Sequence, residues 1–345
     1  MKNNPAPVSL TNKIDELYSA CGRYPLKAKF PDNIMIELTN ACNLKCRMCY
    51  NKDMRRKKGF MTFKLFKKVI DQARGLNIRN AGLYTIGESF LHPGIFDFIS
   101  YAKKRGMQYV YITTNGQVFN DAMIGKIFDS GLDSIKFSID AGRKSSYEST
   151  RKGAKWERLV DTIKKIRAIR DRRGSALRIF ASYVVMKNNF KEIVDFNETF
   201  KGLIDETRYA FVFNLGGNVD TSSMYSVALR EAWHPCALLW NRFIVTYDGK
   251  LTICCMDFES RLVYGDLKTD TLKGSWNNEV MTGFRQIHKD MEFDKLPICL
   301  RCDEIKMSAD RDRLLSSLVT DMLKKGSLSK RALCAGKIFE RPRSC

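Results

Sequence analysis

Two hydrophobic periods alternate along residues 33–217. Six apolar runs have the pattern of strands, at 33–40, 81–89, 108–116, 133–141, 176–186 and 206–217. Apolar residues recur every three to four positions, as in amphipathic helices, over 62–75, 92–106, 120–131, 153–174 and 188–202. Strand–helix units of roughly 30 residues form parallel sheets covered by helices, either open or curled into a barrel. The pattern therefore predicts an α/β fold whose chemistry lies at the carboxyl ends of the strands.

This alternation stops near Gly217. A polar, turn-rich linker follows, and two strand-like runs within 242–255 flank Asp248–Gly249, a pair typical of a tight hairpin turn. A second group of cysteines comes next, before a helical run and a basic tail. We therefore expect four segments: an N-terminal extension (1–32), an α/β core (33–217), a smaller unit with its own cysteines (218–306) and a basic C-terminal tail (307–345).

The chain has 345 residues, of which 44% are hydrophobic, so it can bury a sizeable core. No apolar run approaches the ~18–20 residues that a membrane span requires, and the N-terminus lacks the apolar stretch of a secretory signal. We therefore expect a cytoplasmic protein. In that reducing compartment the eleven cysteines are expected to ligate metals or clusters instead of forming disulfides.

The net charge is +21. Basic residues gather at 54–58, at 164–173 and in the C-terminal tail. Such a charge favours an anionic partner, which includes nucleic acid, a membrane surface and a phosphorylated or nucleotide-linked substrate. The alternative is a set of solvated helix faces without a partner.

Cys42, Cys46 and Cys49 follow the first expected strand at the spacing C-x3-C-x2-C. Three thiolates on one such loop can bind three of the four irons of a cubane cluster and leave the fourth iron without a protein ligand. An open iron lets a cluster bind and reduce a small molecule. The alternative is structural zinc, which needs a fourth ligand that the loop does not offer as Cys or His.

The run CNLKCRMCY, after a first strand and within a six-unit βα series, resembles the radical S-adenosylmethionine (SAM) superfamily. The resemblance implies a partial (β/α)6 barrel, similar to a TIM barrel, with a small C-terminal iron–sulfur domain. It implies a 4Fe–4S cluster on Cys42, Cys46 and Cys49 whose open iron takes the amino and carboxylate groups of SAM. An electron from an external reductant of the flavodoxin or ferredoxin type then cleaves SAM to a 5′-deoxyadenosyl radical.

Members of this superfamily carry a Gly-Gly-Glu turn after the second strand, where this chain has Ile86-Gly87-Glu88. By resemblance, the backbone of this turn and the Glu88 side chain take the SAM ammonium, and Ile86 departs from the pattern. The alternative for Glu88 is a surface carboxylate. Tyr50 follows the last cysteine and resembles the aromatic residue whose backbone meets adenine.

Polar residues also end the third and fourth expected strands. Asn115, Ser138 and Asp140 stand where the resemblance places ribose or methionine contacts, and turn capping is the alternative for Asn115 and Asp140. Arg151 is a candidate partner for a carboxylate of SAM or substrate, or else a solvated arginine. Residues 184–186 could form the wall of an adenine pocket, and core packing explains them equally well.

A second set of cysteines lies in the C-terminal unit. Cys254 follows Gly249 by five residues, and Cys299 and Cys302 form C-x2-C. With Cys236 they resemble the auxiliary-cluster region of SPASM or twitch radical SAM enzymes in its four-cysteine version. The resemblance implies one auxiliary 4Fe–4S cluster with every iron ligated by protein, which suits one-electron transfer. Tetrahedral zinc is the alternative, because four thiolates suit it.

Cys255 stands beside an expected ligand and is spare. A thiol is a good hydrogen-atom donor, so Cys255 is a candidate catalytic residue that quenches a substrate radical and yields an epimer. The alternative is a small buried hydrophobe. Cys21, Cys334 and Cys345 have no ligand spacing and receive no role.

Three functions remain open. The first is a radical SAM oxidoreductase or epimerase acting on a small polar molecule, such as a sugar or cyclitol, because the roughly 30 residues before the first strand are too few for a peptide-binding domain. The second is a peptide-modifying enzyme whose basic surface holds an acidic leader peptide. The third is an RNA-modifying or RNA-binding protein, which the charge suggests although no RNA-binding module is recognisable.

Overall fold

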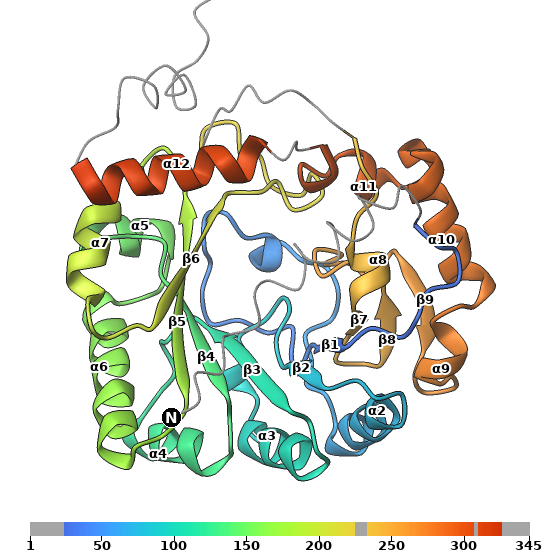
Figure 1. Ribbon diagram of the computed structural model, residues 1–345, viewed down its shortest axis with the longest axis horizontal. Helices are drawn as coiled ribbons and strands as arrows, with labels where there is room; N and C mark the ends of the chain where they lie inside the picture. Colours follow the sequence, from blue (N-terminus) through green and yellow to red (C-terminus); the bar gives the residue numbers. More distant parts are fainter. Residues whose placement is uncertain (1–23, 225–232, 307–309, 326–345) are drawn as a thin grey trace, which may run out of the picture.

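The computed structural model describes residues 24–224, 233–306 and 310–325. The strands of these residues form one nine-stranded sheet in the order β6-β5-β4-β3-β2-β1-β7-β8-β9. The sheet curves around the loop that follows β1, and helices cover its outer face (Figure 1). The expected α/β fold with a parallel, curved sheet is confirmed.

The six strands expected in the core all form, and each pairs in parallel with the next. They are β1 (Asn33–Ile36), β2 (Asn80–Gly82), β3 (Tyr109–Thr114), β4 (Ser134–Ser138), β5 (Arg178–Val185) and β6 (Glu206–Phe211). Several strands end earlier than the apolar pattern suggests, because their last residues belong to loops at the carboxyl edge of the sheet.

The five expected core helices also form. They are α2 (Phe63–Gly75), α3 (Ile95–Lys104), α4 (Asp121–Asp129), α6 (Trp156–Arg173) and α7 (Ile193–Phe200). Amphipathic spacing is evident in α3, which buries Ile95, Phe98, Ile99 and Ala102. A further helix, α5 (Lys144–Thr150), has no apolar period in its sequence KSSYEST, so the pattern gives no signal for it.

Short 3-10 helices complete the core and its loops. They are η1 (Tyr50–Lys52), η2 (Ser89–Leu91), η3 (Phe190–Glu192), η4 (Phe293–Lys295) and η5 (Glu304–Lys306). The first two lie directly after the cysteine loop and the 86–88 turn. They therefore help to set the path of the backbone where the candidate site is expected.

Alternate residues of each strand face opposite sides of the sheet. On β4, Ile135 and Phe137 are buried under the helices, whereas Lys136 and Ser138 lie on the concave side and are partly exposed. The pairing register extends this concave side to β5 and β6, and a ring contact adds the tyrosines that follow β2 and lie on β3. We call this side the lumen, and its polar lining includes Tyr84, Tyr111, Lys136, Ser138, Ser182 and Arg208.

Beyond residue 217 the same sheet continues. The added strands are β7 (Phe243–Val245), parallel to β1, and the antiparallel pair β8 (Lys250–Thr252) and β9 (Val263–Asp266). The expected hairpin forms between β7 and β8, where Gly249 supplies a φ of 93° that favours glycine. The second set of cysteines thus belongs to a segment that flanks the first strand.

The remaining helices lie in the C-terminal part of the chain. They are α8 (Leu238–Asn241), α9 (Leu272–Ser275), α10 (Glu279–Asp290), α11 (Pro297–Leu300) and α12 (Asp310–Lys325). Helix α12 packs on α7 and β6 and buries Leu315, Leu318 and Met322 (Figure 1). Among the described helices, none has an apolar stretch that could cross a bilayer. The tail after residue 325 and Cys21, Cys334 and Cys345 lie outside the described residues.

Candidate functional site

The cysteine triplet lies on the loop between β1 and η1, at the carboxyl edge of the sheet. Two backbone hydrogen bonds tie this loop to the end of α5 and the residues after it. Lys45 N donates to Lys152 O (2.9 Å), and Arg47 N donates to Thr150 O (2.9 Å). The loop therefore holds Cys42, Cys46 and Cys49 in a fixed arrangement, although it contains no regular element.

Two buried asparagines shape this loop from inside. The Asn51 amide donates to Asn40 O (2.8 Å) and to Ile86 O (3.2 Å), which joins the cysteine loop to the 86–88 turn. The Asn40 side chain in turn accepts from Gly59 N (2.9 Å) and donates to Lys57 O (2.9 Å). Neither asparagine has a distinctive sequence signal, because asparagine is common in loops of every kind.

Each thiol of the triplet has a polar neighbour. Asn115 Nδ2 lies 4.0 Å from Cys42 Sγ, Arg151 Nη1 lies 3.7 Å from Cys46 Sγ, and Asn51 N lies 3.4 Å from Cys49 Sγ. Burial nevertheless raises the pKa of Cys42 to about 12, and it also raises the pKa values of Cys46 and Cys49. Thiolates here need more positive charge than the protein itself provides, which bound metal supplies.

Gly87 sits where the cysteine loop and the 86–88 turn meet. A Cβ at this position would lie 2.6 Å from Ala41 O and still closer to Thr39 O, so only glycine fits. The neighbouring Glu88 is buried and is not a surface carboxylate. Its carboxylate accepts hydrogen bonds from Thr114 Oγ1 (2.8 Å), Asn115 N (2.7 Å) and Phe90 N (3.2 Å). Burial raises the pKa of Glu88, and these donors oppose that shift.

Asp140 and Arg151 form a buried ion pair close to the triplet. Asp140 has a φ of 62°, and its second carboxylate oxygen accepts from Val184 N (2.8 Å). Burial disfavours the charge on Arg151, but Asp140 and Cys46 together raise the pKa of Arg151 above its usual value. The arginine is therefore buried against Cys46, instead of solvated, and Asp140 orients it.

The side chains of the other strand-end residues differ in whether they already make hydrogen bonds or core contacts within the protein. The Asn115 amide donates to Asn43 Oδ1 (2.8 Å), next to Cys42. The Ser138 hydroxyl faces the lumen and makes no hydrogen bond to any described residue. Within 184–186, Val185 belongs to the core, whereas Val184 is partly exposed. The free hydroxyl and Val184 are thus the groups here that remain available to a ligand.

Contacts also join the triplet loop to the C-terminal part of the sheet. The Tyr50 ring packs edge-on against Phe258, with 5.4 Å between centroids. The buried Glu37 carboxylate accepts from Arg56 Nη2 (2.7 and 2.8 Å), and Glu259 accepts from Arg56 N (2.9 Å). We call these contacts the seam between the two sets of cysteines. Tyr50 is therefore a packing residue of the seam through its ring, which leaves its backbone near the last cysteine.

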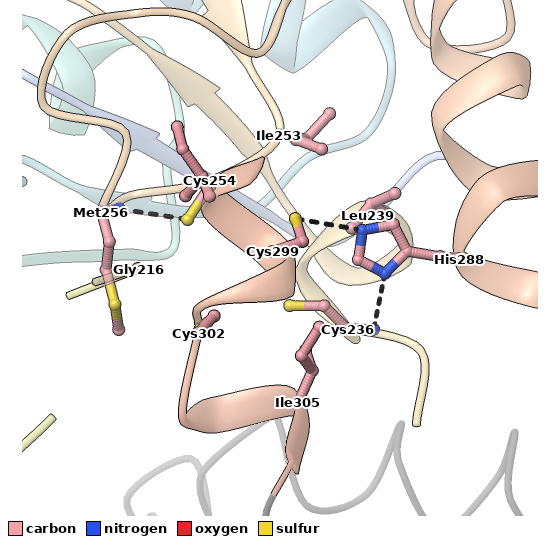
Figure 2. A pocket seen from close by; sticks show the side chains of 11 residues that line it. Gly216, Cys236, Leu239, Ile253, Cys254, Met256, His288, Cys299, Cys302 and Ile305 are labelled. Atoms are coloured by element: carbon pink, nitrogen blue, oxygen red, sulfur yellow. Dashed lines mark hydrogen bonds between the residues drawn. The ribbon is translucent and has the colours of Figure 1, made fainter. Parts of the chain in front are cut away.

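The four cysteines of the second set line one pocket (Figure 2). Cys236 precedes α8, Cys254 follows β8, and Cys299 and Cys302 come from α11 and its end. Burial raises the pKa of Cys299 to about 12 and that of Cys302 to about 11, and it raises the pKa values of Cys236 and Cys254 strongly. The rest of the lining is mainly apolar, including Leu239, Ile253, Ile298 and Ile305.

One polar side chain shares this pocket with the four thiols. His288 is fully buried, and burial lowers the pKa of its ring to about 4. Its Nε2 lies 3.5 Å from Cys299 Sγ, and its Nδ1 accepts a hydrogen bond from Cys236 N (3.2 Å) (Figure 2). A single histidine on a helix has no motif around it, so the sequence offered no signal for this contact.

Two family models and one relative decide what kind of protein this is. The radical SAM superfamily model matches residues 36–199, and a model for an iron–sulfur cluster-binding domain, SPASM, matches residues 236–303. The tungsten-containing aldehyde ferredoxin oxidoreductase cofactor-modifying protein of Pyrococcus furiosus is 30% identical over 318 residues, which cover 79% of this chain and 89% of that protein. The chain belongs to the radical SAM superfamily. Its C-terminal region is a SPASM iron–sulfur domain, as expected from the second set of cysteines.

The chain is also similar to a more distant curated protein and to a solved structure. The S-adenosyl-L-methionine-dependent 2-deoxy-scyllo-inosamine dehydrogenase of Niallia circulans is 21% identical over 282 residues, covering 80% of this chain and 94% of that protein. The structure of Streptococcus suis SuiB bound to the precursor peptide SuiA matches with a TM-score of 0.63 at 15% identity, covering 82% of this chain and 74% of that one. The structural likeness confirms the partial barrel of the radical SAM fold.

The residues present fit the groups that a radical SAM enzyme carries. A cubane cluster places each thiolate on its own iron, so its ligands stand apart. Cys42, Cys46 and Cys49 stand on one loop, each beside a different polar group. Because residue 87 is glycine, the backbone of the 86–88 turn packs directly against the backbone of the cysteine loop. In this superfamily SAM binds beside that loop. The site is thus suited to a 4Fe–4S cluster and SAM.

Cys255 has different surroundings from its neighbour Cys254. Burial raises the pKa of the Cys255 thiol, and the nearby Arg242 opposes this shift. The Cys255 thiol in turn adds to the rise that burial causes in the pKa of Tyr84, which lines the lumen. Cys254 instead lines the pocket of the second set. Two consecutive cysteines therefore have different neighbours: Cys254 lines the pocket of the second set, which we call the auxiliary pocket, and Cys255 lies near Arg242 and Tyr84.

Proposed function

We propose that this radical SAM enzyme removes a hydrogen atom from a small polar molecule in the lumen and then dehydrogenates or epimerises it. The position of Cys255 carries this proposal. Its thiol stands beside the lumen, while the adjacent Cys254 belongs to the auxiliary pocket. A substrate in the lumen would thus lie near a hydrogen-atom donor, the Cys255 thiol. It would also lie near an electron acceptor, the auxiliary cluster that the adjacent Cys254 would ligate.

The proposal assigns each set of cysteines one cluster. Cys42, Cys46 and Cys49 would hold the 4Fe–4S cluster that binds SAM, and Cys236, Cys254, Cys299 and Cys302 would hold one auxiliary 4Fe–4S cluster. When bound and reduced, the first cluster and SAM supply the 5′-deoxyadenosyl radical. The Gly87–Glu88 backbone, the Ser138 hydroxyl and the Asn115 amide would position SAM. The Asp140–Arg151 pair would orient the cysteine loop around Cys46.

Two fates are open to the substrate radical left after hydrogen abstraction. In a dehydrogenation it loses one proton to solvent and one electron toward the second set of cysteines, and an alcohol carbon becomes a carbonyl. In an epimerisation the Cys255 S–H bond breaks and its hydrogen atom forms a new C–H bond on the opposite face. The sulfur radical then takes one electron and one proton, with the electron supplied by an external flavodoxin- or ferredoxin-type reductant.

The names of two relatives support a small-molecule substrate. The Pyrococcus furiosus protein is described as modifying a cofactor, and the Niallia circulans protein is described as a dehydrogenase of 2-deoxy-scyllo-inosamine. The lumen is lined by hydroxyl and charged side chains, which suit a polar substrate of that kind. A peptide substrate, the main alternative, is tested by the same experiment.

Reductive SAM cleavage followed by isotope transfer tests the proposed function. We expect anaerobically reconstituted protein with dithionite and SAM to release 5′-deoxyadenosine, and deuterium to enter it from a deuterated cyclitol or sugar substrate. Mass spectrometry of the 5′-deoxyadenosine measures this transfer. Deuterium transfer from a peptide alone would replace the proposal with peptide modification, and the absence of 5′-deoxyadenosine would reject the enzyme.

The variant Cys255→Ala separates the two fates. If Cys255 donates the hydrogen atom, the variant should still cleave SAM but lose the epimer and accumulate a radical or an oxidised product, as followed by EPR and chromatography. Cys255→Ser is the matched control, because an O–H bond is a much poorer hydrogen-atom donor than S–H in the same place. Unchanged product from the alanine variant would remove Cys255 from the mechanism and leave dehydrogenation.

A further inference from the structure

Three basic side chains gather in or beside the lumen. Lys136 lies on β4, Arg208 pairs with Ser182 across β5 and β6, and Arg242 precedes β7. Lys136 Nζ lies 5.6 Å from the centre of the Tyr84 ring, and Arg242 interacts with the Tyr84 hydroxyl. Tyr84 follows β2, which lies between β4 and β7 in the sheet. Tyr84 therefore lies between Lys136, from the β4 side of the sheet, and Arg242, from the β7 side.

Among the described residues, two of these cations have no anionic partner. Arg242 donates to Asn241 Oδ1 (2.9 Å) and to Met35 Sδ (3.2 Å), neither of which carries charge. Lys136 has the Tyr84 ring, and no carboxylate oxygen of the described residues lies within 4.0 Å of its Nζ. Arg208 differs, because it pairs with Glu206 at 2.9 Å.

The surroundings of Lys136 add to this imbalance. Burial, together with repulsion from Arg208 and Arg242, lowers the pKa of Lys136 to about 8. Asp140 is the nearby carboxylate that opposes the shift, and it is already engaged by Arg151. Partly buried cations that repel one another cost folding free energy unless an anion joins them. Without a bound anion, the cluster of Lys136, Arg208 and Arg242 therefore does not stabilise the folded state.

We propose that the lumen binds the phosphate group of a phosphorylated small-molecule substrate between Lys136 and Arg242. The proposal rests on the proposed function and specifies its substrate. A phosphomonoester carries a charge of about −1.5 to −2 at pH 7, which matches two unpaired cations, whereas a carboxylate neutralises only one. Arginine offers a fork of N–H donors, lysine a mobile point charge, and the Tyr84 hydroxyl a third donor.

Phosphate binding to the cluster-loaded, full-length protein tests this site. With inorganic phosphate as the probe, at constant ionic strength, phosphorus NMR should show saturable line broadening that acetate does not compete away. Lys136→Met and Arg242→Met should each weaken phosphate binding by about ten- to hundredfold. Lys165→Met, on the exposed face of α6 where Lys165 pairs with Asp121, is the matched control and should bind as the parent does.

The outcomes separate the phosphate site from the reaction. Equal phosphate affinity in the parent and in Lys136→Met, or full displacement by acetate, would overturn the phosphate site. SAM cleavage without phosphate binding rejects the site alone, because 5′-deoxyadenosine release does not need it. Phosphate binding without SAM cleavage rejects the proposed function and leaves an anion site.

Stability against pH gives a second readout of the same lysine. The folded-state pKa of Lys136 is about 8 and its usual value is 10.5, so the unfolded chain binds more protons between these limits. Parent stability should therefore rise from pH 8 toward pH 10.5, and Lys136→Met should lack this rise and melt at a higher temperature at pH 7. A lower melting temperature for Lys136→Met would show that Lys136 has a stabilising role and contradict the unpaired charge.

A separate observation concerns the auxiliary pocket. Because the Cys236 N–H occupies Nδ1 of His288, the ring hydrogen of the neutral imidazole lies on Nε2 and points to Cys299 Sγ, 3.5 Å away (Figure 2). Hydrogen bonds to cluster sulfurs favour the reduced, more negative state. We infer that His288 is a positioning residue that holds Cys299 and raises the reduction potential of the auxiliary cluster.

Redox titration of that cluster tests the inference. In full-length protein whose first cluster has been removed by alanine at Cys42, Cys46 and Cys49, the EPR signal reports the auxiliary cluster alone. His288→Phe should retain iron and shift the midpoint potential to a more negative value. His288→Gln keeps an N–H donor and should restore much of the potential. Equal potentials in all three proteins, or loss of iron from both variants, would show a purely structural histidine.

Discussion

Replacing Cys42, Cys46 and Cys49 with alanine should lower the iron of anaerobically reconstituted protein from ~8 to ~4 atoms per chain and abolish 5′-deoxyadenosine formation. We expect a large effect because, in the proposed assignment, these three thiols on a single loop are all the protein ligands of the SAM-binding cluster. Iron analysis and a product assay with dithionite and SAM measure both parts of the result.

The second set of cysteines supplies the matched control. Alanine at Cys236, Cys254, Cys299 and Cys302 should remove the other ~4 irons but leave reductive SAM cleavage in place, since none of the triplet cysteines lines the pocket of the second set. Zinc should be measured in the same samples, because four thiolates also suit that metal. An iron content that the first triple variant does not change would refute the assignment of the triplet.

Gly87→Ala should unfold more easily than the parent by about 2–4 kcal/mol and lose SAM binding. A methyl group at position 87 would press on two backbone carbonyls, Thr39 O and Ala41 O, which cannot rotate away as a side chain would. The cysteine loop and the 86–88 turn would then have to separate. Urea unfolding and equilibrium SAM binding measure the two consequences.

A glycine in open space provides the comparison for Gly87. Gly125 lies within α4, and a Cβ there would meet nothing within 4 Å. Gly125→Ala should therefore raise stability by about 0.5–1 kcal/mol, because alanine loses less backbone entropy in a helix. If Gly87→Ala behaved like Gly125→Ala and still bound SAM, the close approach of the two loops would be unimportant.

The regular part of the fold follows from hydrophobic periodicity alone. All six core strands and the five amphipathic helices bury one or both faces, which imposes a regular spacing of apolar residues on their sequences, as in α3. Helix α5 is the exception, because KSSYEST buries only Tyr147 and Thr150 and so has no repeating apolar face. The continuation of the sheet through β7 also has no local signal, since strand order is a long-range property.

Site residues that belong to a recognisable sequence motif could be predicted from the sequence. Site residues whose role depends on contacts in the folded chain could not. The cysteine spacings identify themselves, and so does the glycine of the 86–88 turn. Asn51, His288 and Lys136 matter through partners that lie tens to hundreds of positions away along the chain or through a shared concave face. Lys136 reads as one of many basic residues until β4 fixes which side of the sheet it occupies.

The parallel pairing of β7 with β1 has a consequence for how the molecule can be divided. A chain cut after residue 217 would leave β1 as an open sheet edge, with unpaired backbone groups that invite aggregation. It would also remove the Tyr247 N–H that donates to Glu37 (3.2 Å) and the Phe258 ring that packs on Tyr50, although Glu37 would keep Arg56. The cysteine triplet therefore depends on the segment that carries the auxiliary pocket, and an isolated barrel fragment is a poor mimic of the intact enzyme.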